Sequence, residues 1–213
     1  MSARTLEELY DTLAADLSWR RKELSETKAV LDGAVGKRQE ALLRGAIPLL
    51  YAHWEGFVKF AGGAYLEYVA ARRLRYEELS VSFVALGIRP RLLDAARRDD
   101  AGLQTDLVRF LIEGRSARSV LHYKDGVDTK SNLSFGVLRN IMNALGLDIS
   151  LFLTKQRLID ERLLCRRNTI AHGRYLAITP SEYDELHEQV VEMLVTFRNL
   201  IDNAASIGLY RVA

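Results

Sequence analysis

The chain of 213 residues contains a single cysteine, Cys165. Neither an internal disulfide nor a thiolate metal cluster can form within one chain, which is typical of proteins in a reducing compartment. We expect Cys165 to be buried, where a free cysteine packs as a small apolar side chain. The cytoplasm is the expected location, and the sequence predicts neither a cofactor nor a metal site.

Long apolar runs are also missing. No segment approaches the ~20 apolar residues that a membrane-spanning helix needs, and Met1 to Glu8 lack the charged-then-apolar order of a signal peptide. We therefore expect no association with a membrane. The net charge is only +2, so the chain as a whole is not built to capture nucleic acid by its charge.

Proline is scarce, with three residues in the chain, and long stretches are rich in Ala, Leu, Glu and Arg. This composition predicts an all-α protein, and 48% hydrophobic content is enough for one core. We expect residues 1–213 to form a single helical-bundle domain with long antiparallel helices. Apolar spacing predicts helices at 5–31, 37–73, 154–172 and 181–205, with a variable middle at 79–133.

Proline and hydroxyl side chains refine these helix boundaries. Pro48 interrupts the second pattern, where it either kinks the helix or starts a new one. Ser134 is a predicted cap for a short helix that ends at Gly146, Thr154 for the helix at 154–172, and Thr179 for the last helix.

The segment 114–132 is predicted to be a long loop with a short β-hairpin. Asp125-Gly126 is a hairpin-type turn signal, which makes Val120 to Tyr123 a candidate strand. Long loops in compact domains are often functional, so contact with RNA or a partner is one reading; a mobile surface loop explains the composition equally well. Its basic and histidine residues are Arg115, Arg118, His122, Lys124 and Lys130.

Charge is distributed unevenly near the C-terminus. Residues 155–174 contain six cations and two anions, whereas residues 181–203 contain six anions and one cation. The acidic segment is either a solvated helix face or a screen that confines the basic surface to one site.

Arg167 and His172 form the most informative pair in the sequence. An arginine can hold a phosphate while an imidazole moves a proton, and the two together can cleave RNA without metal. At about 100° per residue they lie about 140° apart on a helix, so they do not share a face. Asn168 is four residues before His172 and can orient the imidazole. Gly173 favours a left-handed helix end, and a second copy of the helix across a two-fold axis would complete the site.

Three blocks of the sequence carry a family resemblance. The segment from Leu164 to Gly173, LCRRNTIAHG, resembles the signature of the HEPN superfamily, in which Arg, usually followed by a polar residue, precedes His by four to six positions. Tyr51 to Lys59, YAHWEGFVK, and Ser131 to Ser134, SNLS, resemble segments of the stand-alone, MAE-type bacterial branch. Together the blocks span about Leu49 to Asn203.

The resemblance implies an all-α domain, a homodimer formed through the motif helices, and metal-independent endoribonuclease activity. Such proteins often belong to toxin–antitoxin or phage-defence systems, which implies an antitoxin or defence-system partner. The residues Arg167, Asn168 and His172 take the catalytic roles. His172 would activate a ribose 2′-hydroxyl and Arg167 would stabilise the charged transition state, leaving a 2′,3′-cyclic phosphate.

Further residues are candidates for substrate binding, namely Arg166, Arg174, Tyr175 and Glu55. The carboxylate of Glu55 could pair with Arg166 or Arg167, with an ordinary surface position as the alternative. The aromatic residues Tyr51, Trp54 and Phe57 are expected to lie in the core.

Two other functions remain open at this point. The chain could be a non-catalytic module that binds nucleotide or RNA, or a protein partner, through the same dimer. It could also be the target of nucleotidyl transfer, with Tyr175 as the acceptor.

Overall fold

The structure, a computed structural model, describes residues 3–98, 100–123 and 126–212. The described residues form helices and no β-sheet, which confirms the all-α prediction. The α-helices are α1 (Leu6–Asp32), α2 (Gly36–Ala71), α3 (Val81–Arg98), α4 (Ala101–Glu113), α5 (Phe135–Ala144), α6 (Arg166–Ala171) and α7 (Pro180–Ser206). Shorter 3₁₀ turns are η1 (Tyr76–Glu78), η2 (Gly114–Ser116) and η3 (Ser150–Lys155), and η4 (Leu158–Cys165) is a π-helix.

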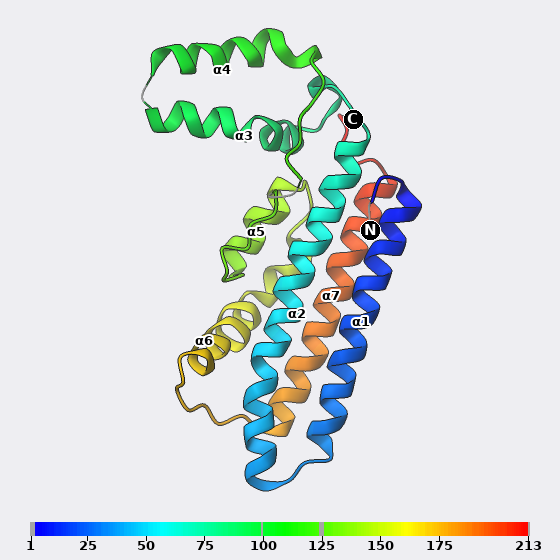
Figure 1. The fold of residues 1–213 in the computed structure, drawn as a ribbon, viewed down its shortest axis with the longest axis vertical. Coiled ribbons are helices and arrows are strands. Elements are labelled where there is room, and N and C mark those ends of the chain that lie inside the picture. Colours follow the sequence, from blue (N-terminus) through cyan, green and yellow to red (C-terminus); the bar gives the residue numbers. More distant parts are fainter. Residues whose placement is uncertain (1–2, 99, 124–125, 213) are drawn as a thin grey trace.

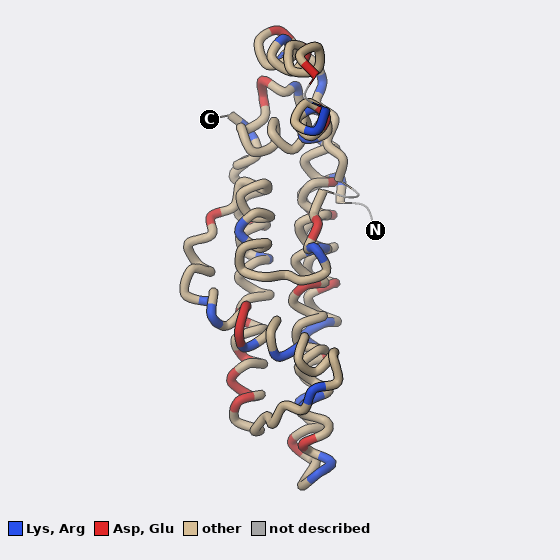
Figure 2. Tube along the Cα trace, turned by 90° about the vertical axis from the view of Figure 1, so that its left-hand side faces the viewer, with Lys and Arg blue, Asp and Glu red and all other residues tan. Residues whose placement is uncertain are grey.

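Three long helices, α1, α2 and α7, pack side by side and form the bundle (Figure 1). Helix α1 runs antiparallel to α2, as expected, but α2 and α7 run in the same direction. A chain that leaves α2 at one end must therefore return along the bundle before α7 begins, and the elements α5, η3, η4 and α6 make that return on one side. Acidic and basic residues occur along the full length of the molecule (Figure 2).

The long helices begin where the sequence supplies capping side chains. Thr5 and Glu8 form a reciprocal capping box at α1, and Thr179 and Glu182 form another at α7. Each box satisfies backbone N–H groups that would otherwise lack partners. Pro180 occupies the first turn of α7, where its missing N–H costs nothing. The predicted caps Thr179 and Ser134 are thereby confirmed.

One hydrophobic core runs through the bundle. Trp54 is fully buried and its ring lies 5.8 Å from that of Phe152 and 6.2 Å from that of Phe197, between ring centroids. These contacts join α2 to η3 and α7, so the side elements share the core of the long helices. Phe57 packs edge-on against Phe197, which confirms the expected core positions of Trp54 and Phe57.

Helix α2 passes through Pro48, so of the two alternatives at this proline the structure contradicts the start of a new helix. One helix prediction was wrong in detail. The segment predicted as one regular helix at 154–172 instead consists of a 3₁₀ turn, a π-helix and a short α-helix. Thr154 lies inside the 3₁₀ turn and caps no helix. A π-helix repeats more slowly than an α-helix, so angles computed at 100° per residue fail across η4.

The predicted β-hairpin in the loop 114–132 is also wrong as far as the structure describes that loop. Val120 to Tyr123 are not in a strand, and Asp125 of the turn signal lies outside the described residues. The loop instead crosses to the end of α2, where Arg118 forms an isolated antiparallel bridge with Arg75. Long-range pairing with residue 75 replaces the local hairpin.

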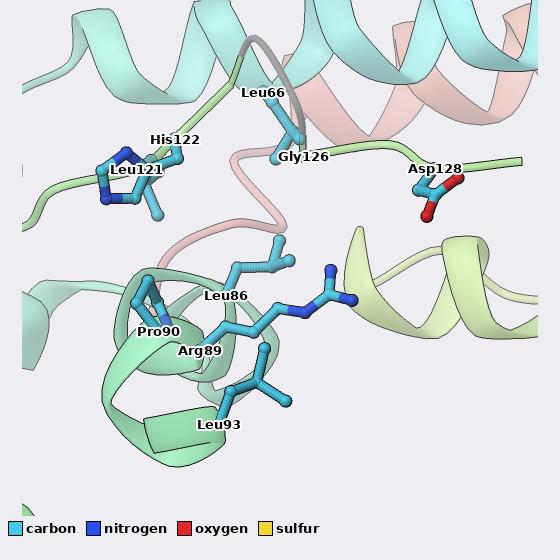
Figure 3. Close-up of a pocket in the computed structure, with 9 residues that line it drawn as sticks. All are labelled: Leu66, Leu86, Arg89, Pro90, Leu93, Leu121, His122, Gly126 and Asp128. Carbon is cyan, nitrogen blue, oxygen red and sulfur yellow. The ribbon is translucent and has the colours of Figure 1, made fainter. Parts of the chain in front are cut away.

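Helices α3 and α4 project from one end of the bundle as a hairpin (Figure 1). Beneath α3, a groove of about 310 Å³ opens toward the loop, lined by apolar side chains such as Leu86 and Leu93 and by Arg89 (Figure 3). It contains none of the predicted site residues except His122 of the loop. None of the described helices combines the length and apolar character needed to cross a membrane.

Candidate active site

The sequence motif from Arg167 to His172 runs through α6, which stops in a glycine cap. Gly173 adopts φ +72°, its N–H donates to the carbonyl of Ile170, and the N–H of Arg174 donates to that of Thr169. This pair of bonds is the Schellman arrangement. It leaves His172 exposed as the last residue before the left-handed turn, as the sequence predicted.

Arg167 is held by neutral groups. Its Nη1 donates to Oδ1 of Asn168 at 2.6 Å and to Oδ1 of Asn132 at 3.3 Å, and its Nη2 donates to the carbonyl of Ser131 at 3.3 Å. The guanidinium carbon also lies 4.6 Å from the ring centroid of Tyr51, a cation–π contact. The side chain is therefore fixed on four sides while remaining partly exposed.

The expected contact between Asn168 and His172 does not involve the asparagine side chain. The backbone carbonyl of Asn168 accepts from the N–H of His172 at 3.0 Å, while its side-chain oxygen binds Arg167. Within the described residues, no hydrogen bond or ion pair holds the imidazole. In a single chain, Asn168 positions the arginine and the imidazole is left available.

His172 lies on a separate groove of about 370 Å³. Arg167 is not among the residues that line it, because its side chain turns toward Ser131 and Tyr51 instead. Arginine and histidine therefore occupy different sides of the helix end in one chain, as the spacing predicted. The groove is lined by Asp160, Leu164, Cys165, Asn168, Thr169, His172 and Arg174.

Cys165 and Tyr175 are both exposed. The prediction that Cys165 is buried was wrong, because the wide π-helix η4 ends there and turns this residue toward the groove. Tyr175 is 67% exposed and its ring lies 5.1 Å from the guanidinium carbon of Arg44 on α2. Arg174 is exposed and lines the groove with His172.

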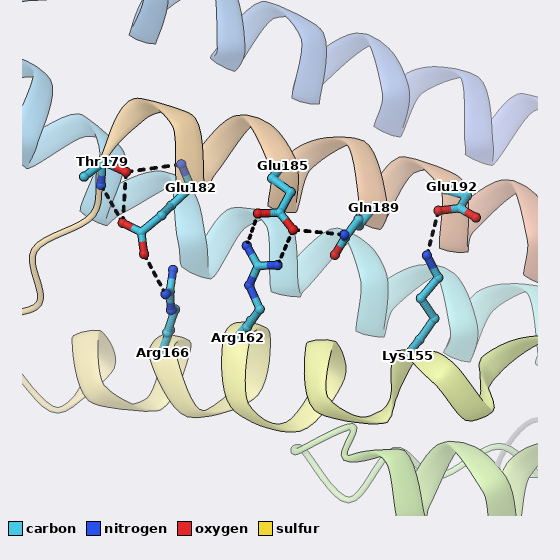
Figure 4. Close-up of polar contacts among 8 residues, drawn as sticks. All are labelled: Lys155, Arg162, Arg166, Thr179, Glu182, Glu185, Gln189 and Glu192. Carbon is cyan, nitrogen blue, oxygen red and sulfur yellow. Dashed lines mark hydrogen bonds and ion pairs between the residues drawn. The ribbon is translucent and has the colours of Figure 1, made fainter.

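The basic segment 155–174 and the acidic helix α7 are joined by a row of ion pairs (Figure 4). Arg166 pairs with Glu182 at 3.0 Å, and Arg162 makes a two-pronged contact with Glu185 at 2.6 and 2.9 Å. Lys155 pairs with Glu192 at 2.8 Å further along α7. Neither earlier alternative describes this arrangement fully: the acidic residues of α7 hold segment 155–174 against the helix and neutralise three of its six cations.

These contacts lower the pKa values of two carboxylates on α7. The backbone N–H of Thr179 and the guanidinium of Arg166 lower the pKa of Glu182, and Arg162 lowers that of Glu185. Both carboxylates are therefore ionised at neutral pH. Arg166, a candidate for substrate binding, is occupied by Glu182 in this structure.

Glu55 pairs with neither Arg166 nor Arg167. It is half-buried next to the hydroxyl of Tyr51, so the alternative of an ordinary surface carboxylate is also inaccurate. Burial raises the pKa of Tyr51 to about 12, the Leu133 N–H lowers it, and Glu55 raises it. His53, two residues away, points to α1, where its Nε2 lies 2.9 Å from Oε2 of Glu23.

From the sequence, no functional role was assigned to three residues that contact Arg167, namely Tyr51, Ser131 and Asn132. Tyr51 is buried, as predicted, but its ring also supports Arg167, and its hydroxyl accepts the Leu133 N–H at 2.5 Å. Two blocks of family resemblance, YAHWEGFVK and SNLS, thus meet the third at one point. In the sequence, the resemblance of these blocks to one family was the signal that could have linked these residues to Arg167. Their contact is visible only in the fold.

No group of three or more His, Cys, Asp or Glu side chains within residues 3–98, 100–123 and 126–212 is arranged to hold a metal ion. The site consists of an arginine in a neutral setting and an unrestrained histidine at one helix end.

The class that the described residues define is an all-α bundle, in which Arg167 lies in the short helix α6 and His172 at its C-terminal end. The chain matches the family described as HEPN_MAE_28990-like HEPN over residues 9–210, and it belongs to this family. HEPN domains are nucleotide-binding and RNase-like modules. Comparison with curated proteins gives no match, and neither does comparison with solved structures.

Proposed function

We propose that the protein is a metal-independent endoribonuclease that acts as a homodimer, as a toxin or defence effector in the cytoplasm. The observation that carries the proposal is the state of Arg167: it is a fixed, partly exposed cation without a carboxylate partner among the described residues. Such a group is suited to bind a phosphodiester.

The proposed chemistry uses the ribose 2′-hydroxyl as the nucleophile. One His172 imidazole takes the proton from this hydroxyl, which attacks the adjacent phosphorus and expels the 5′-oxygen of the next nucleotide. His172 of a second copy returns a proton to the leaving oxygen, and Arg167 stabilises charge on the non-bridging oxygens. The products are a 2′,3′-cyclic phosphate and a 5′-hydroxyl.

The separation of the two side chains supports a dimer. Arg167 and His172 turn to different sides of one helix end, so an isologous contact between two copies of α6 would bring the arginine of one chain to the histidine of the other. Arg174 and Tyr175, both exposed, are then the candidate contacts for flanking nucleotides. An antitoxin or defence-system protein remains the expected partner.

The test is cleavage of purified RNA in the presence of EDTA, with analysis of product ends. We expect 2′,3′-cyclic phosphate ends, and a loss of about 10²–10⁴-fold in rate for His172→Ala. His122→Ala is the matched control, because His122 is also exposed but lies on the groove beneath α3. Products with a 3′-hydroxyl, or unchanged activity in His172→Ala, would contradict the mechanism. Binding of RNA without cleavage would favour the alternative of a non-catalytic module.

A further inference from the structure

Arg167 differs in its partners from the basic residues that precede it in segment 155–174. Four of them have a carboxylate within 3.0 Å. Arg167, in contrast, binds two amide oxygens and one backbone carbonyl, and it lies over the ring of Tyr51. The four paired residues are Lys155, Arg157, Arg162 and Arg166.

Neutral acceptors and carboxylates affect a guanidinium differently. Both satisfy its N–H donors and fix its orientation, but a carboxylate also cancels its charge. The contacts of Arg167 use its two terminal nitrogens, and its other N–H groups have no partner within the part of the chain that the structure describes. An anion approaching from solvent therefore meets an oriented group that keeps its full positive charge.

The backbone that supplies two of these acceptors is strained. Lys130 and Ser131 both have φ in the left-handed region, at +57° and +56°, which costs roughly 1 kcal/mol or more for each non-glycine residue. Asp128 Oδ1 holds the N–H of Lys130 at 2.8 Å, and the carbonyl of Thr129 holds the N–H of Asn132 at 3.1 Å. These bonds keep the turn in a form that points the Ser131 carbonyl and the Asn132 side chain at Arg167.

We propose that Ser131 and Asn132 form a charge-neutral cradle that positions Arg167 for a substrate phosphodiester, with Asn132 as a positioning residue. The inference rests on the proposed function and specifies how its anion site is built. The strained turn exists because a carbonyl and an amide must face the guanidinium where an acidic side chain would neutralise it.

The decisive variant is Asn132→Asp, which keeps the shape of the side chain and adds a negative charge next to Arg167. We expect its affinity for a 2′-O-methyl RNA oligonucleotide to fall about 10–100-fold, the range for losing a charged hydrogen-bonded contact. The slope of log affinity against log salt should decrease by about one phosphate contact. The melting temperature should stay the same or rise, because the new ion pair is within the protein.

Asn203→Asp is the matched control, since it makes the same charge change at an exposed asparagine near the C-terminal end of α7, outside the cradle. We expect wild-type RNA affinity for this variant. The 2′-O-methyl RNA cannot be cut by 2′-hydroxyl attack, so its binding tests the cradle separately from catalysis. If wild type binds this RNA but cuts no RNA, and Asn132→Asp weakens the binding, the cradle stands while the nuclease proposal fails.

Three results would overturn the cradle. The first is equal affinity of wild type and Asn132→Asp for the oligonucleotide. The second is a fall in the melting temperature of Asn132→Asp that accompanies its loss of binding, which would indicate a structural role only. The third is failure of wild type to bind the oligonucleotide at all.

Discussion

The side-chain oxygen of Asn168 accepts a hydrogen bond at 2.6 Å from Arg167, its neighbour in the sequence. The two catalytic candidates that are adjacent in the chain are thus bonded to each other, whereas the bond between Asn168 and His172 is one in which the His172 backbone N–H donates to the Asn168 carbonyl. In this arrangement Asn168 positions Arg167, so replacing Asn168 should affect the cleavage rate through the arginine.

We expect Asn168→Ala to lower the rate of RNA cleavage about 10-fold, the order expected for losing one charge-assisted hydrogen bond. The midpoint of the pH–rate profile should not move, because among the described residues the Asn168 side chain binds Arg167 and makes no hydrogen bond to the imidazole. Measurement of cleavage rates from pH 5 to pH 9 checks this. A displaced midpoint would return Asn168 to its predicted role as the residue that orients His172.

Replacement by alanine should affect stability at Arg166 and the salt dependence of RNA binding at Arg174. Arg166 is bound to Glu182, so Arg166→Ala should lower the free energy of unfolding by up to about 1 kcal/mol and leave the salt dependence of RNA binding unchanged. Arg174 has no carboxylate partner among the described residues, so Arg174→Ala should reduce the salt slope by about one contact with little effect on stability. Titrations with 2′-O-methyl RNA at several salt concentrations measure the salt slope of each variant, and urea unfolding measures its stability. A reduced slope in Arg166→Ala would show that the ion pair opens when RNA binds.

Gly56 and Gly63 in helix α2 provide a paired test of packing. A Cβ atom at Gly56 would lie 2.9 Å from Nη1 of buried Arg20, whereas one at Gly63 would meet nothing within 4 Å. Gly56→Ala should cost about 1 kcal/mol, because Arg20 must give up its bond to the carbonyl of His53. A charged hydrogen bond of this kind is worth about 1.5–3 kcal/mol, which exceeds the gain of up to about 1 kcal/mol in helix propensity. Gly63→Ala should stabilise the protein by up to about 1 kcal/mol through its higher helix propensity. Equal effects of the two in urea unfolding would show that Arg20 is not confined there.

Stability should fall between about pH 7 and pH 5 because of the buried His53 and the half-buried His187. Burial lowers the pKa of His53 and of His187, with Glu23 opposing the effect at His53 and Lys28 adding to it at His187. The unfolded chain therefore binds protons near its ordinary pKa of about 6.5, before the folded chain does. The stability due to the neutral imidazoles is complete above that pH and is lost below it.

Urea unfolding at pH 5, 6, 7 and 8 measures this loss. His53→Gln should flatten the profile, and His122→Gln should leave it as in wild type because His122 is exposed. A wild-type profile without a slope in this range would contradict the assignment.

Local chemistry made parts of the fold predictable. Thr179, Pro180 and Glu182 define a helix start through contacts within four residues, and Gly173 defines a helix end through its left-handed backbone. The core positions of Trp54 and Phe57 followed from apolar spacing. The π-helix from Leu158 to Cys165 was not predictable in this way, because an apolar pattern does not distinguish a widened turn from a regular one, and the exposure of Cys165 depends on it.

The sequence by itself determined the all-α class, the family resemblance, and the presence of Arg167 and His172 on different sides of one helix end, since these depend on composition, motif and local geometry. Only the tertiary structure decided which basic residues are neutralised. Glu182 and Glu185 reach Arg166 and Arg162 because α7 packs against the motif segment, and a strained turn more than thirty residues earlier presents neutral oxygens to Arg167. Charge cancellation depends on distances between segments that are remote in the chain, and those distances are set by packing.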